Sequence, residues 1–574
     1  MKKVTPAIAT LLFSSAVIAA GFSAVALAQD RAARKTGKAD KPYLNASPED
    51  IAKWRELKFG LFIHWGPVSL VGTEIGWSRG GPRRGTGGTG EIPLDVYDNL
   101  YKKFNPVKFD GKEWAEIAKA AGMRYMVFTS RHHDGFTNFD SKVTDYKITS
   151  PDSPYRKDIV KQLADACHES GLGFGLYYSQ PDWHHPDYRT PNHSRYVKYL
   201  HEQVRELMTN YGRVDMLFFD GLGGSAKDWD AEPLFKSIRT LQPHIIINNR
   251  CGLPADYDTP EQEIGKMQTD RPWETCMTIG DQWAWKPNDR IKSLKQCLQT
   301  LIKCAGGDGN LLFNVGPMPD GRIEPRQVER LKAMGDWLRL YGESIYGTRG
   351  GPFRRGAWGT ATYKGNTVYV HVLDPKLDPV VLPPIGKKIV ASRVLTGGTA
   401  SVKQTEGGIE ISVPAADRKE IDTIVVLTLD GPAAEAKVGN AATDSVATGK
   451  KATASNVFQN MVGAHGPAKA VDDNPETRWA TDAGTHQAWL QVDLGEPKTI
   501  GRAVIHEAYA GRVKEFELQA KDGDSWKTFF HGTTIGEDFA AKFPPIKAQV
   551  IRLNILKATE GPTIWEFQLF APAK

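Results

Sequence analysis

The chain has 574 residues, which is too long for one hydrophobic core and predicts two to four domains. Its 73 Lys and Arg residues nearly balance 67 Asp and Glu residues, giving a formal net charge of +6. With no basic block or stripe, nucleic acid is excluded as an expected partner.

The first residues predict an export signal. Lys2 and Lys3 precede an apolar stretch at 7–27, and Ala-Leu-Ala at 26–28 forms a small-x-small cleavage pattern. A single membrane anchor is the alternative, because the stretch is long enough to span a bilayer. The cleavage pattern favours a signal peptide at 1–28, so we expect an exported, periplasmic or secreted protein that leaves the membrane after signal removal.

Strands and helices alternate from about residue 50 to residue 346. The expected strands cover 57–64, 173–179, 214–220, 244–248 and 310–315, with another beginning at Tyr125. The expected helices cover 110–121, 158–170, 192–210, 232–241, 290–305 and 325–340. Repeated strand–helix units predict an α/β chain with a parallel TIM-like (β/α) barrel at 42–347. An open doubly wound sheet is the alternative, but no glycine-rich phosphate fingerprint supports it.

The remaining chain is predicted to be rich in β structure. Short runs at 360–363, 367–373, 388–394, 409–413 and 423–428 predict a β-sandwich at 348–430. An Ala-, Gly-, Thr- and Ser-rich stretch at 431–449 is typical of a linker, and a further β module follows at 450–574. Five cysteines without regular spacing predict buried thiols rather than disulfides or a zinc site.

Polar residues gather at four strand ends. They are His64-Trp65-Gly66, Arg131-His132-His133-Asp134-Gly135, Tyr177-Tyr178-Ser179 and Asp220. In a barrel all four ends lie on the same face, where active sites of this fold are built. Adjacent histidines could hold a metal, move protons or grip a substrate. On a strand they point to opposite faces, so both reach one ligand only if the chain turns, as Gly135 permits. We therefore favour sugar binding over a metal.

Asp220 ends a buried strand, where a carboxylate is costly unless it is used or paired. Its alternative role is to cap the next helix. Cleavage of a sugar bond needs a second carboxyl group, and the acidic candidates after Asp220 are Glu261, Glu263 and Glu274. Trp273 could raise the pKa of Glu274. Spacing alone does not choose among them, and each could also be an ordinary loop glutamate.

Together these motifs resemble the α-L-fucosidases of glycoside hydrolase family 29 over about residues 42–429. The resemblance implies a retaining mechanism with no catalytic cofactor or metal, in which Asp220 is the nucleophile. It implies fucose-binding roles for His64, Trp77, His132, His133, Tyr178, Phe218 and Arg250.

The segments 259–261 and 273–279 look like the branch that favours α-1,3- and α-1,4-linked fucose, which makes Glu261 the first choice for the acid/base and Glu274 the second. The chain departs from the family pattern at Trp283-Ala-Trp285 and in a Gly/Arg-rich insert at 79–90, both expected to border the aglycone site. An enzyme for fucans or other linkages and a non-catalytic fucose-binding lectin are the alternatives.

The segments 470–479 and 489–495 resemble a discoidin-type, galactose-binding-like carbohydrate-binding module. The resemblance implies a structural Ca²⁺ held by Asp472, Asn474, Thr477 and Glu566. A polar turn without metal is the alternative. His486, His506 and Arg512 are weaker candidates for a sugar-binding face, and the module could also be purely structural. The expected partners are fucosylated oligosaccharides or glycoconjugates.

Overall fold

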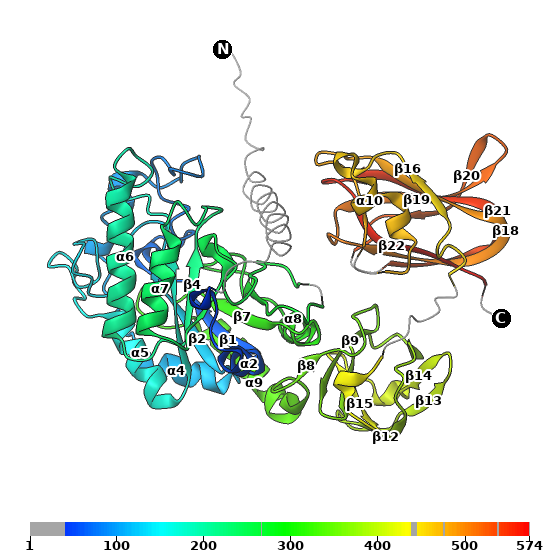
Figure 1. Ribbon diagram of the computed structural model, residues 1–574, viewed down its shortest axis with the longest axis horizontal. Coiled ribbons are helices and arrows are strands. Elements are labelled where there is room, and N and C mark those ends of the chain that lie inside the picture. The colour runs from blue at the N-terminus through cyan, green and yellow to red at the C-terminus, as the bar shows by residue number, and fades with distance from the viewer. Residues whose placement is uncertain (1–40, 266, 438–444, 475–476, 537–538, 573–574) are drawn as a thin grey trace, which may run out of the picture. The chain divides into compact units, whose positions relative to one another are not determined.

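The computed structural model describes residues 41–265, 267–437, 445–474, 477–536 and 539–572 (Figure 1). The predicted signal peptide lies outside these residues, as does the 438–444 part of the predicted linker. The chain forms two compact units. The first runs to Gly351 and includes 360–364 and 420–422, and the second contains the rest.

The first unit is built on a parallel sheet of seven strands in the order β5-β4-β3-β2-β1-β7-β6. The strands are β1 (Phe59–Ile63), β2 (Tyr125–Arg131), β3 (Gly173–Ser179), β4 (Met216–Asp220), β5 (Ile246–Ile247), β6 (Glu274–Thr278) and β7 (Asn310–Val315). Nearly every residue in them is buried, which explains their continuous apolar runs.

The segment 256–262 closes the ring between β5 and β6. Parallel bridges join Asn248 to Tyr257, Asp258 to Trp273 and Glu261 to Cys276. The sequence predicted neither this pairing nor β6, because Pro and acidic residues interrupt the apolar pattern on which strand prediction depends. The TIM-like barrel expected from the sequence is confirmed, and the segment carrying Glu261 is part of its wall.

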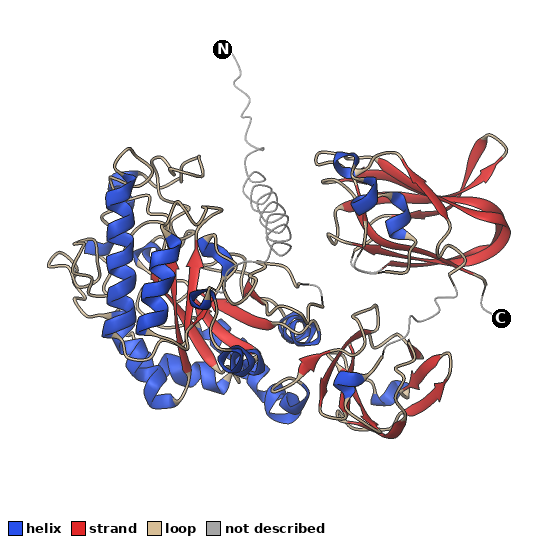
Figure 2. Cartoon of the chain, in the orientation of Figure 1, coloured by secondary structure: helices blue, strands red, loops and turns tan. Residues whose placement is uncertain are grey.

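Helices surround the sheet (Figure 2). They include α2 (Pro48–Leu57), α4 (Gly111–Ala120), α5 (Ile159–Ser170), α6 (His193–Asn210), α7 (Ala231–Leu241), α8 (Leu294–Gly306) and α9 (Pro325–Tyr341). Their ends follow capping chemistry. Asp158 accepts from the backbone of Lys161 at the start of α5, and Gly171 ends that helix at φ 72°. Helix α8 begins later than predicted because Ser293 forms its capping box.

The second unit contains two all-β parts. In the first, β12 (Ile389–Val394), β15 (Thr423–Leu429) and β10 (Thr367–Val372) lie side by side, and β11 (Val380–Leu382), β14 (Gly408–Ser412) and β13 (Ser401–Thr405) form another sheet. The pair β8 (Arg349–Gly350) and β9 (Gly359–Lys364) belongs largely to the first unit. The antiparallel β structure expected after the barrel is therefore present.

The second all-β part is one antiparallel sheet arrangement around its own core. Its strand order is β17-β22-β18-β21-β19-β20, and β16 pairs with β18. The bounds are β16 (Lys451–Ala454), β17 (Trp479–Ala480), β18 (Ala488–Glu507), β19 (Val513–Asp522), β20 (Ser525–Gly532), β21 (Phe539–Ala558) and β22 (Thr563–Phe570). Fully buried Trp479, Leu490, Phe516 and Phe567 belong to its core.

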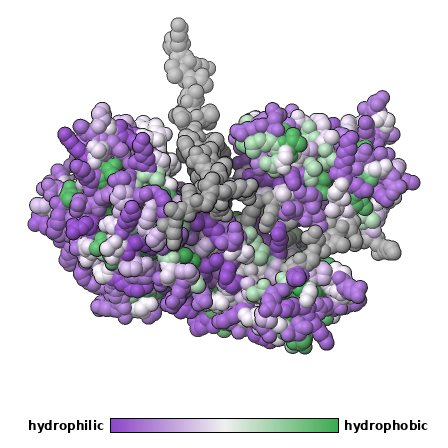
Figure 3. Space-filling model, in the orientation of Figure 1, coloured by the Kyte–Doolittle hydropathy of each residue, from purple (hydrophilic) through white to green (hydrophobic). Residues whose placement is uncertain are grey.

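All five cysteines are buried free thiols, as the sequence predicted. Hydrophilic residues cover most of the surface seen in Figure 3, with only scattered hydrophobic ones. No helix among the described residues has the length and apolar character needed to span a bilayer.

Candidate active site

Asp220, the last residue of β4, is the centre of a polar cluster at the carboxyl ends of the strands. Its side chain is 14% exposed. The hydroxyl of Tyr177 donates to Oδ2 at 2.8 Å, and Arg250 Nη1 donates to Oδ1 at 3.2 Å. Strand pairing sets this arrangement, because Ser179 of β3 lies opposite Asp220 of β4. Tyr177 precedes Ser179 by two residues, so its side chain points to the same face of the sheet as Asp220.

Arg250 connects Asp220 to Glu261. It lies in the short helix η4 (Asn249–Cys251), directly after β5. Its Nη1 is 2.8 Å from Glu261 Oε2, while Nη2 donates to the carbonyl of Thr259. The distances of 3.2 and 2.8 Å from one nitrogen cap the separation of the two carboxylate oxygens at 6.0 Å. These two carboxylates raise the pKa of Arg250, although burial opposes them.

Three histidines line the same cluster as neutral imidazoles. Burial lowers the pKa of His64 and of His133 to about 3, and that of His132 well below its usual value. The His132 ring is nearly parallel to Tyr177, and its centroid lies 5.6 Å from that of His64. The turn that brings the histidine pair together requires Gly135 at φ 80°, since a Cβ there would lie 2.3 Å from Asp182.

Hydrogen-bond partners fix the tautomers of two histidines. His64 Nδ1 donates to Asn314 Oδ1 at 2.7 Å, so its Nε2 is an acceptor. Ser179 donates its only hydroxyl proton to the carbonyl of Pro181, so His133 Nδ1 must donate to Ser179 Oγ. The bare Nε2 of His133 therefore faces Asp220 Oδ2 at 3.5 Å. A sugar hydroxyl group lying beside them could donate its one proton to either acceptor.

Aromatic rings enclose the cluster. Trp77 lies 5.6 Å from His133 and Trp283 lies 4.8 Å from His64, centroid to centroid. Phe218 lies 5.3 Å under the Arg250 guanidinium. The structure thus brings together seven of the predicted residues with Glu261: His64, Trp77, His132, His133, Phe218, Asp220 and Arg250.

Tyr178 requires a correction. Successive residues of a strand point to opposite faces, and Tyr178 points out of the barrel toward α6. Its hydroxyl donates to Gln203 at 2.8 Å, and its ring packs 4.3 Å from the Arg131 guanidinium. Tyr177 is the tyrosine beside Asp220.

Glu274 also requires a correction. It is the first residue of β6, and Tyr125, the first residue of β2, donates a hydrogen bond to its carboxylate. It therefore lies at the amino ends of the strands, opposite to Asp220. Burial raises its pKa to about 8, so it is a protonated structural acid inside the barrel at neutral pH.

Glu74 is a residue of the site that the sequence did not predict. Its carboxylate accepts from the backbone of Ile75, Trp283 and Ala284 at 2.9–3.2 Å, and burial raises its pKa to about 7. It thereby ties the loop before Trp77 to the loop that carries Trp283. Its position three residues before Trp77 was the available signal.

One nitrogen of His132, one of His133 and an oxygen of Asp220 lie within 4.8 Å of one another, a spacing that could suit a metal ion. The charges around this trio disfavour a cation. Asp220 already accepts from Arg250 and Tyr177, and the Arg250 guanidinium would lie beside the metal.

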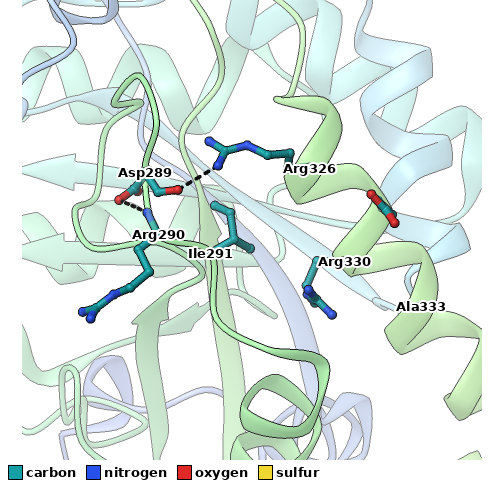
Figure 4. A pocket seen from close by; sticks show the side chains of 7 residues that line it. Asp289, Arg290, Ile291, Arg326, Arg330 and Ala333 are labelled. Atoms are coloured by element: carbon teal, nitrogen blue, oxygen red, sulfur yellow. Dashed lines mark hydrogen bonds between the residues drawn. The ribbon is translucent and has the colours of Figure 1, made fainter.

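A separate cavity of about 410 Å³ lies between residues 289–291 and helix α9 (Figure 4). Arg326 donates to the carbonyl of Asp289 at 2.9 Å, and the Asp289 carboxylate accepts from the backbone of Asp281 and Arg290. None of the residues that line it is among the candidate active-site residues.

The C-terminal module has an acidic cluster at the predicted calcium position. Thr477 donates to the Asp472 carboxylate at 2.7 Å. Glu566 is buried, its Oε1 has no hydrogen-bond partner, and burial with Asp472 and Asp473 raises its pKa to about 8. An acid that is costly to ionise without a counter-charge fits an oxygen-liganded cation such as Ca²⁺. Asn474 is exposed beside it.

The three weaker candidates for a sugar-binding face of the module contact different residues. His486 Nδ1 bonds the carbonyl of Ala558, and His506 lies across the strand pair from Glu566. Arg512 stacks on Tyr509 at 3.9 Å, and Arg478 lies over both Tyr509 and Trp565.

A (β/α) barrel that holds two carboxylates among neutral imidazoles and aromatic rings at the carboxyl ends of its strands defines a glycoside hydrolase. The family model for alpha-L-fucosidase matches residues 25–343, more than half of the chain, and the chain belongs to this family. The F5/8 type C domain model matches residues 451–567.

Known proteins agree. The chain is 28% identical to an alpha-L-fucosidase of Branchiostoma floridae over 64% of its length and 89% of the relative. It is 31% identical to the human plasma alpha-L-fucosidase over 51% of its length and 68% of the relative.

Solved structures extend the comparison. Alpha-L-fucosidase isoenzyme 1 from Paenibacillus thiaminolyticus is 35% identical, with a TM-score of 0.61, over 67% of this chain and 99% of that one. A family 29 alpha-L-fucosidase from Bacteroides thetaiotaomicron, trapped as a covalent intermediate with 2-fluoro-fucosyl fluoride, is 25% identical, with a TM-score of 0.60, over 69% and 99%. The enzyme from Vibrio sp. strain EJY3, at 22% identity and TM-score 0.64, covers 91% of this chain and shares its fold.

Proposed function

We propose that this α-L-fucosidase is an exo-acting retaining enzyme that releases terminal α-1,3- or α-1,4-linked L-fucose. The observation that carries the proposal is the shared Arg250 nitrogen, which limits Asp220 Oδ1 and Glu261 Oε2 to a separation of at most 6.0 Å. Retaining glycosidases hold their carboxyl groups about 5–5.5 Å apart, whereas inverting enzymes need about 6.5–9.5 Å.

In the first step, Asp220 attacks the anomeric carbon and forms a covalent fucosyl ester, while Glu261 protonates the departing oxygen. Tyr177 and Arg250 orient the Asp220 carboxylate through their hydrogen bonds to its two oxygen atoms. In the second step, Glu261 takes a proton from water, which attacks the ester and releases fucose with retained configuration. The Glu261 side chain is 40% exposed, which suits a group that must meet both the leaving group and water. The trapped intermediate of the Bacteroides relative supports this route.

Fucose recognition follows from the neutral imidazoles. The Nε2 atoms of His64 and His133 are acceptors, so they can bind sugar hydroxyl groups without adding charge. A sugar hydroxyl group beside His133 Nε2 and Asp220 Oδ2 could donate its one proton to either acceptor and so reduce the repulsion between them. The rings of Trp77, Trp283 and Phe218 offer apolar surface for the methyl group and C–H face of fucose.

Asp220→Asn and Glu261→Gln, assayed on an aryl fucoside with wild type, test the mechanism. We expect Asp220→Asn to lose at least about 10⁴-fold in kcat while its melting temperature stays unchanged. Near-normal turnover by this variant would refute the assignment.

Release of fucose from a Lewis-type trisaccharide and from 2-fucosylated lactose, compared side by side, tests the linkage. Preference for the trisaccharide supports the α-1,3/1,4 assignment, and preference for the lactose overturns it. Binding without release from either would indicate the lectin alternative.

We further propose that catalysis needs no cofactor, that the C-terminal module binds glycans and holds a structural Ca²⁺, and that the chain is exported. The acidic cluster of Asp472 and Glu566 supports the calcium site. The Ala-Leu-Ala pattern at 26–28 supports cleavage before Gln29. Amino-terminal sequencing of the protein recovered from the periplasm or medium tests export. A chain that stays in the cytoplasm with Met1 intact would overturn it.

A further inference from the structure

Arg83, in the Gly/Arg-rich insert at 79–90, is separated from the nucleophile by two layers of side chains, a pair of indoles and then His133. Its guanidinium lies 5.2 Å from the Trp77 ring centroid and 5.7 Å from that of Trp183. Both rings contact His133, with centroid distances of 5.6 and 5.1 Å, and His133 Nε2 is 3.5 Å from Asp220. The positive charge is close enough to the imidazole to contribute to the low pKa of His133.

Arg83 forms no ion pair with a described carboxylate, and the exposed Glu91, just past the insert, acts on it through its charge alone. Its Nε is buried without a hydrogen-bond partner among the described residues. One Nη donates to the backbone carbonyl of Trp77, which is neutral. Partial burial lowers the pKa of Arg83, so the site carries the desolvation cost of a cation.

Two other arginines around the site are compensated. Arg250 contacts both Asp220 and Glu261, and Arg79 makes a two-point ion pair with Asp98 at 2.6 and 2.7 Å. Because their positive charge is already paired with carboxylates, neither is suited to bind an anionic ligand. Arg83 therefore leaves an excess positive charge at the rim of the site.

The backbone holds Arg83 in this position. Gly80 donates to Ile92 at 2.7 Å and Ile92 donates back to Ser78 at 2.9 Å, which pairs the two sides of the insert. Gly90 packs so tightly that a Cβ would lie 2.2 Å from the carbonyl carbon of Ser78. At the tip, Gly87 donates to the carbonyl of Arg83 at 2.8 Å. The insert is thus a closed loop that presents Arg83 without needing to reorganise.

We propose that Arg83 binds an anionic substituent, a sulfate ester or a carboxylate, carried by the substrate beside the fucosyl bond. Fucose itself is neutral, so the anion belongs either to a modified fucose or to the sugar attached to it. A planar guanidinium that lies over two indoles, and whose Nη1 has no hydrogen-bond partner among the described residues, matches such an oxyanion. The inference rests on the proposed fucosidase function of the same site.

The test compares kcat/KM for fucose release from matched substrates in wild type, Arg83→Gln and Arg83→Lys. One pair is fucosyl-α-1,3-N-acetylglucosamine with and without a sulfate on the glucosamine, and the other is an aryl fucoside with and without a sulfate on fucose. Arg290→Gln is the control, because Arg290 is an 86% exposed arginine of the Trp283 loop.

We expect wild type to prefer the sulfated member of one pair, and Arg83→Gln to lower that preference about tenfold to a hundredfold, mainly through KM. Arg83→Lys should keep part of it, Arg290→Gln should keep all of it, and raised salt should weaken it in wild type. The pair that responds identifies the sugar that carries the anion.

An equal sulfated-to-unsulfated ratio in wild type and Arg83→Gln for both pairs would overturn the inference. An equal loss on all substrates would do the same, because it would mean that Arg83 only supports Trp77. If wild type releases no fucose from any of them, the proposed function fails instead. Titration of sulfated disaccharide against Asp220→Asn, with and without Arg83→Gln, then decides the role of Arg83 by binding alone.

Discussion

Glu274 makes the stability of the barrel depend on pH. Its carboxyl group is almost completely buried and accepts a hydrogen bond from Tyr125. Burial raises its pKa from 4.5 to about 8. Because the folded state holds this proton more tightly than the unfolded chain, the group's contribution to stability is fully present below about pH 4.5. That contribution is lost as the pH rises to about 8.

The size of the effect follows from linkage. Each pH unit inside this window removes about 1.4 kcal/mol, so between pH 5 and pH 8 the contribution of Glu274 falls by about 3.5 kcal/mol. Glu274→Gln keeps the shape and the acceptor for Tyr125 but has no proton to lose. The variant should therefore gain this amount on wild type as the pH rises.

Guanidinium denaturation followed by tryptophan fluorescence at pH 5, 6, 7 and 8 measures the difference. Other titrating groups are shared by both proteins and cancel in the comparison. Glu116→Gln, at an exposed position on α4, is the control and should run parallel to wild type. Parallel curves for Glu274→Gln would refute the reasoning, as would a large loss of kcat, which would return Glu274 to the chemistry.

Three other outcomes are expected. Glu261→Ala should slow an aryl fucoside with a good leaving group less than a natural glycan, and azide should restore its turnover; no rescue would argue against Glu261 as the acid/base. Tyr177→Phe should lower kcat about tenfold to a hundredfold, whereas Tyr178→Phe should leave kcat unchanged and lower the free energy of unfolding by about 1–2 kcal/mol. The reverse pattern would contradict the placement of the two rings. Chelation should lower the melting temperature of the wild-type C-terminal module, and Glu566→Gln should lessen that response; an unchanged melting curve would argue against a cation there.

Much of the site could be predicted because parallel strands bring their carboxyl ends to one face. Asp220, His64 and the pair at 132–133 follow from that rule and from the end of each apolar run. The choice between Tyr177 and Tyr178 could not be made this way. It depends on which face each residue of β3 takes, and strand pairing with β4 sets that parity.

The missed features share a different cause. The segment 256–262 and strand β6 contain Pro, Asp and Glu, so no apolar alternation marks them, and only closure of the ring makes them strand-like. Without that closure, Glu274 and Glu261 looked alike as loop acids. Glu74 and Trp283 meet across more than two hundred residues, a contact that no local pattern encodes.

Arg250 Nη1 contacts both Asp220 and Glu261, so a change of charge at one carboxyl group affects the other during the proposed reaction. As the attacking carboxylate, Asp220 competes with Glu261 for the positive charge of Arg250. Once Asp220 becomes a neutral ester, this competition ends and the whole charge of Arg250 acts on Glu261. The loss of charge at one carboxyl group would thus prepare the other to act as a base, at the moment when water must be activated.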